Sequence, residues 1–288
     1  MVAVAGNRPS DRDRIHQISG RPGTPLDRPP GGQLLTAFRS LAYQLLFLPW
    51  TLALSLLYLP LLAVGSRRFM QRCAAFWLEG SLLFQKAILG LSFEVRGLDN
   101  LPADGRVLVA AKHQSAWDTM VFHHLLADPA YILKKELLSL PFIGWYLQKS
   151  GQVAIDRKAG MKALKLMVEG AKAALADHRQ IVIFPEGHRQ PPGVAGDYHS
   201  GVAMLYGALD VPLVPVALNS GLFWRRNAFL RRPGVITLEF LPAIPPGLDR
   251  KTLMATIEER IETATRRLEQ EAATRFPRLA AQISPPAP

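Results

Sequence analysis

Cysteine and acidic residues are both scarce in this sequence of 288 residues. It has one cysteine, Cys73, so no internal disulfide can form and no zinc-type cysteine spacing exists. Its 23 aspartates and glutamates are outnumbered by 34 lysines and arginines, which gives a formal net charge of +11. Such an excess of positive charge favours an anionic partner, either nucleic acid or an acidic membrane surface.

Apolar periodicity is missing from residues 1–33, which are rich in proline, glycine and arginine. This composition predicts a disordered basic tail. We do not expect a secretory signal, because the first apolar core comes too late in the chain. Asp11, Asp13 and Asp27, together with the prolines and glycines, argue against an amphipathic mitochondrial presequence.

Charge is absent from residues 40–65. An apolar run of about 20 residues can cross the hydrocarbon core of a bilayer. Pro49 and Pro60 would kink or interrupt such a helix, and residues 69–91 again have a helical pattern. Residues 34–91 are therefore predicted to form a membrane-associated helical hairpin that dips into one leaflet or crosses it. The alternative is a buried core hairpin of a soluble protein.

After residue 92, short apolar runs alternate with amphipathic stretches. The runs predicted as strands are residues 93–96, 107–111, 131–133, 153–155, 181–184, 213–218 and 236–240. Helical patterns cover residues 158–176 and 250–273. The alternation predicts an α/β domain over residues 92–275, a mixed sheet covered by helices, with a flexible tail over residues 276–288.

A histidine and an aspartate follow the predicted strand at residues 107–111. His113 would lie at the carboxyl edge of this strand, where ligands of α/β sheets usually bind, and Asp118 would follow in the first turns of a helix. The carboxylate would orient the imidazole and leave its second nitrogen free to take a proton. Taken alone, this spacing also fits a helix-capping histidine with an unrelated aspartate.

A second polar segment follows the predicted strand at residues 181–184. Glu186, Gly187 and Arg189 would lie at the same sheet edge as His113 if the two strands are parallel. The arginine suits a phosphate, and the glycine permits close approach of a ligand. Glu186 would bind the substrate or form a salt bridge with the arginine. The alternative is an ordinary turn with a surface arginine.

Further cations end two other predicted strands. Lys134 and Arg157 could both reach a phosphate held near Arg189, although strand-end charges are often simply solvated. The prolines at 212 and 215 shape an apolar strand that carries no reacting group. Adjacent histidines at 123 and 124 do not share a helix face, and no set of ligands with metal spacing surrounds them, so we expect no metal.

Taken together, these segments resemble the motifs of the glycerolipid acyltransferase family in order and spacing. The resemblance covers roughly residues 35–245 and is greatest for bacterial 1-acyl-sn-glycerol-3-phosphate acyltransferases. It implies that His113 is the general base and Asp118 its partner. Arg157, Glu186, Gly187 and Arg189 match the acceptor-binding residues, with Lys134 a weaker match. One departure is His188, at a position usually held by threonine or serine.

The family resemblance also implies a reaction and a place for it. A fatty acyl group would pass directly from a thioester, acyl-CoA or acyl-carrier protein, to the free hydroxyl of 1-acyl-sn-glycerol-3-phosphate, giving phosphatidate. No cofactor is implied, and the partners would be membrane phospholipids and the lysophospholipid acceptor. The site would face the cytoplasm at the inner membrane. The sequence contains no G-x-S-x-G motif, which argues against an α/β-hydrolase.

Other functions remain open at the level of sequence. The same chemistry could serve another lyso-lipid, such as a lyso-ornithine lipid. A non-enzymatic basic protein that binds membranes or nucleic acid is a further alternative. Nucleic acid is not expected, because the basic residues form no aromatic-basic binding module.

One loop alternates large apolar residues with pairs of arginines, over residues 221–232. Our hypothesis is that it rests on the bilayer, with Trp224 and Phe229 inserted and the arginines on lipid phosphates. The alternative is a loop folded over its own domain.

Overall fold

A seven-stranded mixed sheet forms the centre of the protein, as a computed structural model of residues 32–156 and 160–283 shows. The strands lie in the order β1-β7-β6-β2-β5-β3-β4, and the β6–β7 pair is antiparallel whereas the other strand pairs are parallel. All the predicted strands form. They are β1 (Leu91–Arg96), β2 (Leu108–Ala111), β3 (Pro129–Lys134), β4 (Val153–Ile155), β5 (Gln180–Ile183), β6 (Leu213–Leu218) and β7 (Gly234–Phe240).

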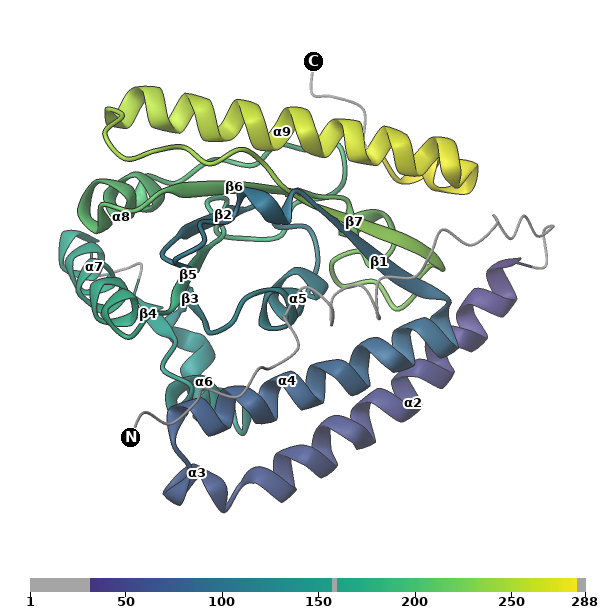
Figure 1. Cartoon of the computed structure of the whole chain (residues 1–288). Helices are drawn as coiled ribbons and strands as arrows, with labels where there is room; N and C mark the ends of the chain where they lie inside the picture. The colour runs from purple at the N-terminus through teal and green to yellow at the C-terminus, as the bar shows by residue number, and fades with distance from the viewer. Residues whose placement is uncertain (1–31, 157–159, 284–288) are drawn as a thin grey trace, which may run out of the picture.

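Helices cover both faces of the sheet (Figure 1). One face carries α7 (Gly160–Ala176), α8 (Gly201–Leu209) and α9 (Arg250–Arg275). The other carries α5 (Trp117–Leu125), with a helical hairpin below it. Every residue of β2, β5 and β6 is buried, because these central strands are covered on both sides. This explains why they are continuous apolar runs rather than alternating ones.

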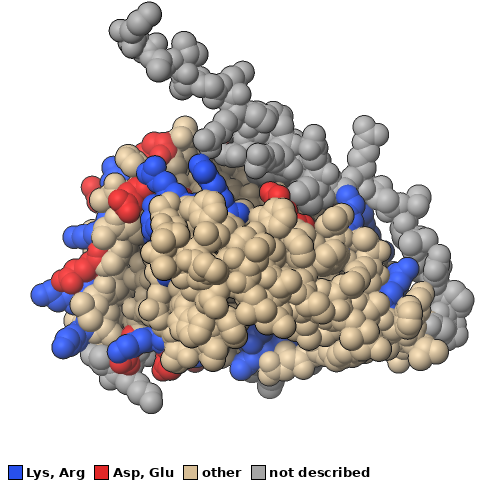
Figure 2. Space-filling model, turned by 90° about the horizontal axis from the view of Figure 1, so that it is seen from below, with Lys and Arg blue, Asp and Glu red and all other residues tan. Residues whose placement is uncertain are grey.

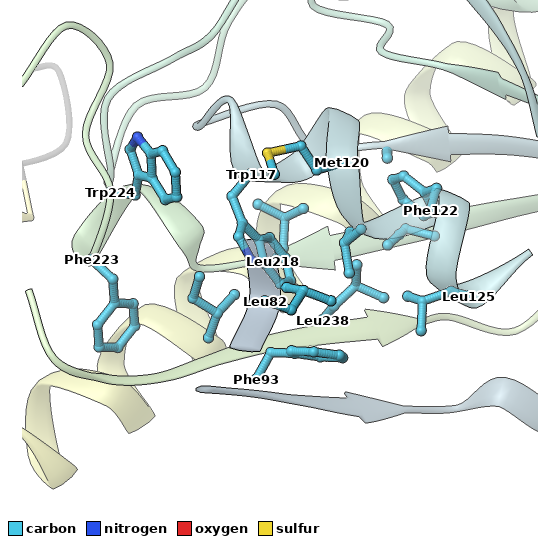
Figure 3. Close-up of a cluster of buried hydrophobic side chains, with 14 of the residues drawn as sticks. Leu82, Phe93, Trp117, Met120, Phe122, Leu125, Leu218, Phe223, Trp224 and Leu238 are labelled. Atoms are coloured by element: carbon cyan, nitrogen blue, oxygen red, sulfur yellow. The ribbon is translucent and has the colours of Figure 1, made fainter. Parts of the chain in front are cut away.

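The core between α5 and the sheet is rich in aromatic residues. Trp117 is 1% exposed and packs edge-on against Phe93 of β1, at 5.6 Å between ring centroids (Figure 3). Phe122 packs against Phe240 of β7 at 6.3 Å. Large aromatic surfaces buried in this way dominate the packing free energy and hold the start of α5 firmly on the sheet.

The hairpin consists of α2 (Gly32–Tyr58), the short α3 (Leu61–Val64) and α4 (Arg67–Phe84), which continues as a π-helix, η1 (Gln85–Leu89). Pro49 lies inside α2 without ending it, whereas the helix stops just before Pro60. Trp50 fills the space over Gly80, where an added Cβ would lie 2.5 Å from the indole. The glycine thus permits close approach of α2 and α4.

Among the described residues, α2 is the one helix long and apolar enough to cross a membrane, and 17% of its most apolar window is buried. Its outward side is formed by large apolar residues, among them Leu34, Phe38, Leu45, Leu52 and Leu57. The predicted hairpin therefore exists, and most of its first helix is not buried in a protein core.

Short helices connect the remaining elements. They are η2 (Leu98–Asn100), η3 (Lys135–Ser139), α6 (Ile143–Lys149), η5 (Ser220–Leu222) and η6 (Pro277–Gln282). Leu279 of η6 is completely buried, so the packed chain reaches beyond residue 276. The tail predicted from residue 276 is too long for this reason. The predicted N-terminal tail lies outside the described residues as far as residue 31.

Candidate active site

His113 and Asp118 face each other at the carboxyl end of β2. The strand ends at Ala111, and α5 begins at Trp117, so His113 sits in the connecting turn and Asp118 in the first helical turn. The Nδ1 atom of His113 lies 3.1 Å from Oδ2 of Asp118. The predicted pair is therefore formed within a single strand–helix connection.

The carboxylate of Asp118 is completely buried and held from several directions. Its Oδ2 accepts the backbone N–H groups of Gln114 and Ser115, each at 2.7 Å. Its Oδ1 accepts the hydroxyl of Ser220 at 2.5 Å. Hydrogen bonds to an ionised group are the strong ones, so this carboxylate has a fixed place and orientation.

A stacking contact on one face of the ring also holds the imidazole of His113 in place. Its ring stacks on Phe184, with 4.2 Å between centroids and 25° between planes. The side chain is 13% exposed, so the ring is reachable from solvent. Within the described chain, Nε2 has no hydrogen-bond partner, whereas Nδ1 faces the carboxylate. The free nitrogen can take a proton from a bound hydroxyl.

The segment after β5 lies directly against His113. Because β2 and β5 pair in parallel, both segments leave the sheet at the same edge, as predicted. The backbone N–H of Gln190 donates to the carbonyl of His113 at 2.8 Å. Gly187 has φ of 66° and forms the turn that allows this return, a conformation that glycine adopts without strain.

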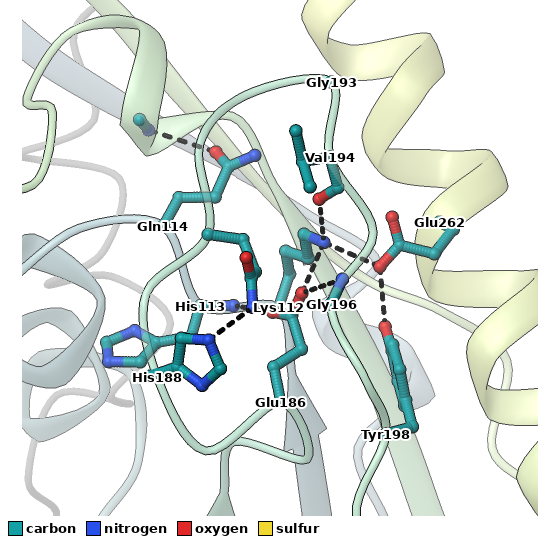
Figure 4. A network of polar contacts seen from close by, with 12 residues as sticks. Lys112, His113, Gln114, Glu186, His188, Gly193, Val194, Gly196, Tyr198 and Glu262 are labelled. Carbon is teal, nitrogen blue, oxygen red and sulfur yellow. Dashed lines mark hydrogen bonds and ion pairs between the residues drawn. The ribbon is translucent and has the colours of Figure 1, made fainter. Parts of the chain in front are cut away.

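Glu186 is turned toward the interior rather than toward Arg189. Its Oε1 pairs with Nζ of Lys112 at 2.7 Å and accepts the N–H of Gly196 at 3.1 Å, while Oε2 accepts the N–H of His113 at 3.0 Å (Figure 4). Burial raises the pKa of Glu186, and the positive charge of Lys112 opposes that rise.

This burial corrects one expectation for Glu186. The predicted salt bridge with Arg189 is wrong, because Lys112 is the cationic partner of the carboxylate. Glu186 is completely buried, so a substrate would reach neither carboxylate oxygen without rearrangement of the site. Its contacts instead hold the backbone of His113.

The predicted phosphate-binding cations are placed differently from one another. Arg189 is partly exposed in the turn after Glu186, and its guanidinium forms no ion pair within the described part of the chain. Lys134 is exposed at the carboxyl end of β3, which pairs in parallel with β5 and so ends at the same edge. Arg157 lies outside the described residues. His188 is exposed, and its ring contacts Gln190 at 3.0 Å.

An apolar pocket of about 340 Å³ opens beside these segments. Phe184, Pro185 and Gly187 form its wall next to His113, and His199 also lines it. The remaining wall comes from apolar residues of β3, β4, β5 and α7: Ile132, Ile155, Ala163, Leu164, Met167 and Ile183. The pocket can therefore take a hydrocarbon chain close to the imidazole.

Several site residues were not identified from the sequence. Lys112 and Gln114 flank His113 and are almost completely buried, at 1% exposed each. Their partners Glu262 and Glu269 lie on α9, each next to an apolar position of its buried stripe. That adjacency is the one signal in the sequence for these two glutamates, since the helical pattern over residues 250–273 does not by itself distinguish them from solvated ones.

The loop over residues 221–232 is folded onto α2. Trp224 is 7% exposed and packs edge-on against Tyr43, with Arg231 stacked over both rings. The backbone N–H of Arg231 donates to the hydroxyl of Ser40 at 3.0 Å. Insertion of Trp224 into a bilayer is therefore wrong, whereas Phe229 is 51% exposed.

The part of the chain that the structure describes contains no candidate metal site. No group of three or more His, Cys, Asp or Glu side chains there could hold a metal ion. The histidines at 123 and 124 contact aromatic rings, those of Tyr131 and Phe93.

A histidine paired with an aspartate lies beside an apolar pocket at one edge of the mixed α/β sheet, an arrangement that suits acid–base chemistry on a bound hydroxyl. Residues 92–219 match the family model described as Acyltransferase. A 1-acyl-sn-glycerol-3-phosphate acyltransferase of Pseudomonas aeruginosa is 32% identical over 186 residues, which are 65% of this chain and 72% of that protein. The chain belongs to the acyltransferase family.

More distant relatives agree with this family. The alpha form of 1-acyl-sn-glycerol-3-phosphate acyltransferase of Homo sapiens is 29% identical over 198 residues, 68% of this chain and 69% of the human protein. The crystal structure of the 1-acyl-sn-glycerophosphate (LPA) acyltransferase PlsC from Thermotoga maritima matches with a TM-score of 0.65. That match covers 81% of this chain and 97% of the other at 22% identity, which establishes the shared fold.

Proposed function

We propose that this protein transfers a fatty acyl group from a thioester to the free hydroxyl of 1-acyl-sn-glycerol-3-phosphate, giving phosphatidate. Relatives from bacteria and animals carry the name of that activity. The observation that carries the proposal is the imidazole of His113, held by Asp118 and Phe184 with Nε2 unbound. That arrangement suits a general base acting on a hydroxyl.

His113 would act once as a base and once as an acid. Its Nε2 takes the proton from the glycerol hydroxyl as that oxygen attacks the thioester carbonyl. The tetrahedral intermediate then collapses, the C–S bond breaks, and the leaving thiolate takes the proton back from the imidazolium. Asp118 stabilises the imidazolium between these two steps. A positioned base of this kind contributes about 10²–10⁴-fold.

Acceptor recognition would depend on the cations at the same sheet edge. The guanidinium of Arg189, which forms no ion pair with any described residue, can bind a phosphate through two parallel hydrogen bonds. Lys134 would add charge from the end of β3, and Arg157 is a further cation that the family resemblance implies. A lyso-lipid without a phosphate would gain less from these residues. The apolar pocket beside Phe184 would hold an acyl chain.

The membrane would hold the enzyme through the exposed apolar side of α2. Viewed from below, the molecule has a broad face without charge, and charged residues of both signs lie mainly around its border (Figure 2). Large apolar residues exposed along α2 account for such a face. An exposed apolar surface suits contact with a bilayer, and the net positive charge of the chain favours an anionic leaflet. We propose the cytoplasmic side of the inner membrane as its location.

The test is an activity assay on the full chain in vesicles. Lysophosphatidate and lyso-ornithine lipid are each offered with acyl-CoA and with acyl-carrier protein. We expect turnover of lysophosphatidate, and a folded, vesicle-bound His113→Ala protein without activity. Retained turnover in this variant would show that His113 is not the general base. A preference for lyso-ornithine lipid would show that lysophosphatidate is not the natural acceptor.

A further inference from the structure

The C-terminal helix α9 reaches the active site through two buried glutamates. Glu262 and Glu269 are seven residues apart, which is close to two helical turns, so they point to the same side of the helix. They are 6% and 1% exposed. Their partners are the two neighbours of His113 in the chain, Lys112 and Gln114.

The first contact runs through the ammonium of Lys112, which is completely buried. It donates to Oε1 of Glu262 and to Oε1 of Glu186, each at 2.7 Å, and to the carbonyl of Val194 at 3.0 Å (Figure 4). These acceptors use the full donor capacity of an ammonium. Lys112 therefore cannot move without leaving a buried charge unpaired.

Glu186 extends this contact to the candidate base. One oxygen of its carboxylate holds Lys112, and the other accepts the backbone N–H of His113 at 3.0 Å. A continuous series of charge-assisted hydrogen bonds thus leads from α9 to the backbone of His113. The hydroxyl of Tyr198 donates to the same oxygen of Glu262 at 2.9 Å and fixes the origin of the series.

The second contact runs through Gln114. Its Nε2 donates to Oε1 of Glu269 at 2.7 Å, and its Oε1 accepts the N–H of Gly221 at 3.0 Å. Glu269 also accepts the N–H of Gly193 at 3.0 Å. The backbone N–H of Gln114 is one of the donors that hold Asp118. Glu269 therefore acts on the carboxylate half of the pair.

The electrostatics of this interior oppose a purely stabilising role. The ammonium of Lys112 pairs with two carboxylates, those of Glu186 and Glu262, and its charge also acts on a third buried carboxylate, Glu269, without a direct contact. Burial raises the pKa of Glu186 and of Glu269. Apolar residues of similar volume would pack such an interior at lower cost. This polar arrangement is costly, and all of it contacts the turn between β2 and α5 that contains His113. A role in positioning His113 explains it better than a contribution to stability.

We propose that Glu262 and Glu269 are positioning residues of the acyl transfer reaction. Through Lys112 and Gln114 they hold the backbone of His113 and the carboxylate of Asp118 in line. Neither glutamate touches substrate, and α9 is by this means part of the machinery of the site. The proposal relies on the proposed function for the role of His113 as base.

The experiment compares Glu262→Gln and Glu269→Gln, each in the full chain. Glutamine keeps the shape of the side chain but removes the charge that holds the donor. We expect kcat to fall by about 10–100-fold, while KM for both substrates changes by less than about threefold. Glu259→Gln is the matched control, since Glu259 is exposed on the same helix and forms no ion pair with any described residue.

A second readout needs no substrate. The Nδ1–H proton of His113, hydrogen-bonded to Asp118, gives a downfield NMR resonance that is assigned by its loss in His113→Ala. We expect this resonance to move upfield or vanish in both glutamine variants. If the wild type does not acylate lysophosphatidate, the proposed function fails, and the resonance still decides the positioning role.

A merely structural role would give a different result. The glutamine variants would then melt at lower temperature but retain the downfield resonance of His113. Their kcat per folded molecule would also lie within about twofold of the kcat of Glu259→Gln. That outcome would overturn the proposal. Should Glu262→Gln not fold, Glu269→Gln decides alone, because its contact does not involve the ammonium of Lys112.

Discussion

Ser220 donates its hydroxyl to Oδ1 of Asp118 at 2.5 Å, across 102 residues of sequence. The other oxygen of this carboxylate faces Nδ1 of His113 at 3.1 Å. Ser220 begins η5, the turn that follows β6, so a neighbouring strand holds the carboxylate from a second side. A carboxylate held at both oxygens cannot rotate away from the imidazole.

Ser220→Ala is expected to lower kcat about tenfold, because Asp118 loses a hydrogen bond to a charged acceptor. KM should stay nearly unchanged, since Ser220 is completely buried. Steady-state kinetics in vesicles measure both constants. Ser139→Ala, whose hydroxyl donates to a nearby carbonyl at the surface, is the control. Equal kcat for the two variants would show that the carboxylate needs no second support.

Asp128 connects the hairpin to the sheet at the end of the strands opposite the site. Its carboxylate accepts two hydrogen bonds from Nη1 of Arg67 on α4, at 2.7 and 2.9 Å. It also pairs at 3.1 Å with Arg179, which is 3% exposed. Asp128→Ala should lower the free energy of unfolding by about 3–5 kcal/mol, because the buried guanidinium of Arg179 loses its carboxylate and retains backbone carbonyls as acceptors.

Thermal unfolding of Asp128→Ala and of a control variant, Asp177→Ala, measures this loss of stability. Asp177 lies 3.8 Å from Arg67 and is 66% exposed, so Asp177→Ala should change stability by less than about 1 kcal/mol. If Asp128→Ala is as stable as Asp177→Ala, the ion pair is not what holds α4 on the domain.

The strands were predictable because each is an apolar run bounded by turn residues, a signal that local sequence carries. The meeting of His113 with the turn at Gly187 followed from parallel strands ending at one edge. Glu262 and Glu269 were not recognised, since a glutamate on an amphipathic helix is usually solvated. Their burial depends on Lys112 and Gln114, about 150 residues earlier.

The same reason explains the mistaken expectation for Trp224. An aromatic residue beside arginines has the composition of an interfacial anchor. Whether its ring meets lipid or protein depends on what lies against it. Here Tyr43 of α2 covers the indole, and no local pattern near residue 224 indicates that contact.

His123 should make stability depend on pH. Burial, and then the charge of Arg179, lowers the pKa of His123 from 6.5 to about 4. Between these values the unfolded chain binds a proton that the folded chain does not, so stability is lost as the pH falls from 6.5 toward 4. His123→Gln removes this proton and should flatten the dependence.

Melting temperatures recorded at closely spaced steps between pH 7.5 and pH 4 test whether the lowered pKa of His123 makes stability depend on pH. The gap between wild type and His123→Gln should change progressively below the ordinary pKa of 6.5 and stay constant above it. Parallel curves for the wild type and His123→Gln would contradict the lowered pKa of His123.

The arginine loop after η5 should strengthen binding to anionic vesicles. Arg225, Arg226 and Arg232 form no ion pair with any described carboxylate, and Phe229 beside them is 51% exposed. A cation near an acidic leaflet contributes about 1 kcal/mol, so replacing these three arginines by glutamine should weaken binding markedly. Arg231 is left in place, since it packs between Tyr43 and Trp224.

Vesicle flotation with and without phosphatidylglycerol measures the effect of the loop triple variant. Glutamines at Arg250, Arg260 and Arg266 of α9 remove the same charge from the side of the sheet opposite α2 (Figure 1). The loop variant should lose affinity for anionic vesicles only, and more than the α9 variant does, because its charges adjoin the exposed apolar side of α2 that we propose as the membrane contact. Equal losses in the two triple variants would mean that net charge alone attracts the protein to the membrane, with no contact by this loop.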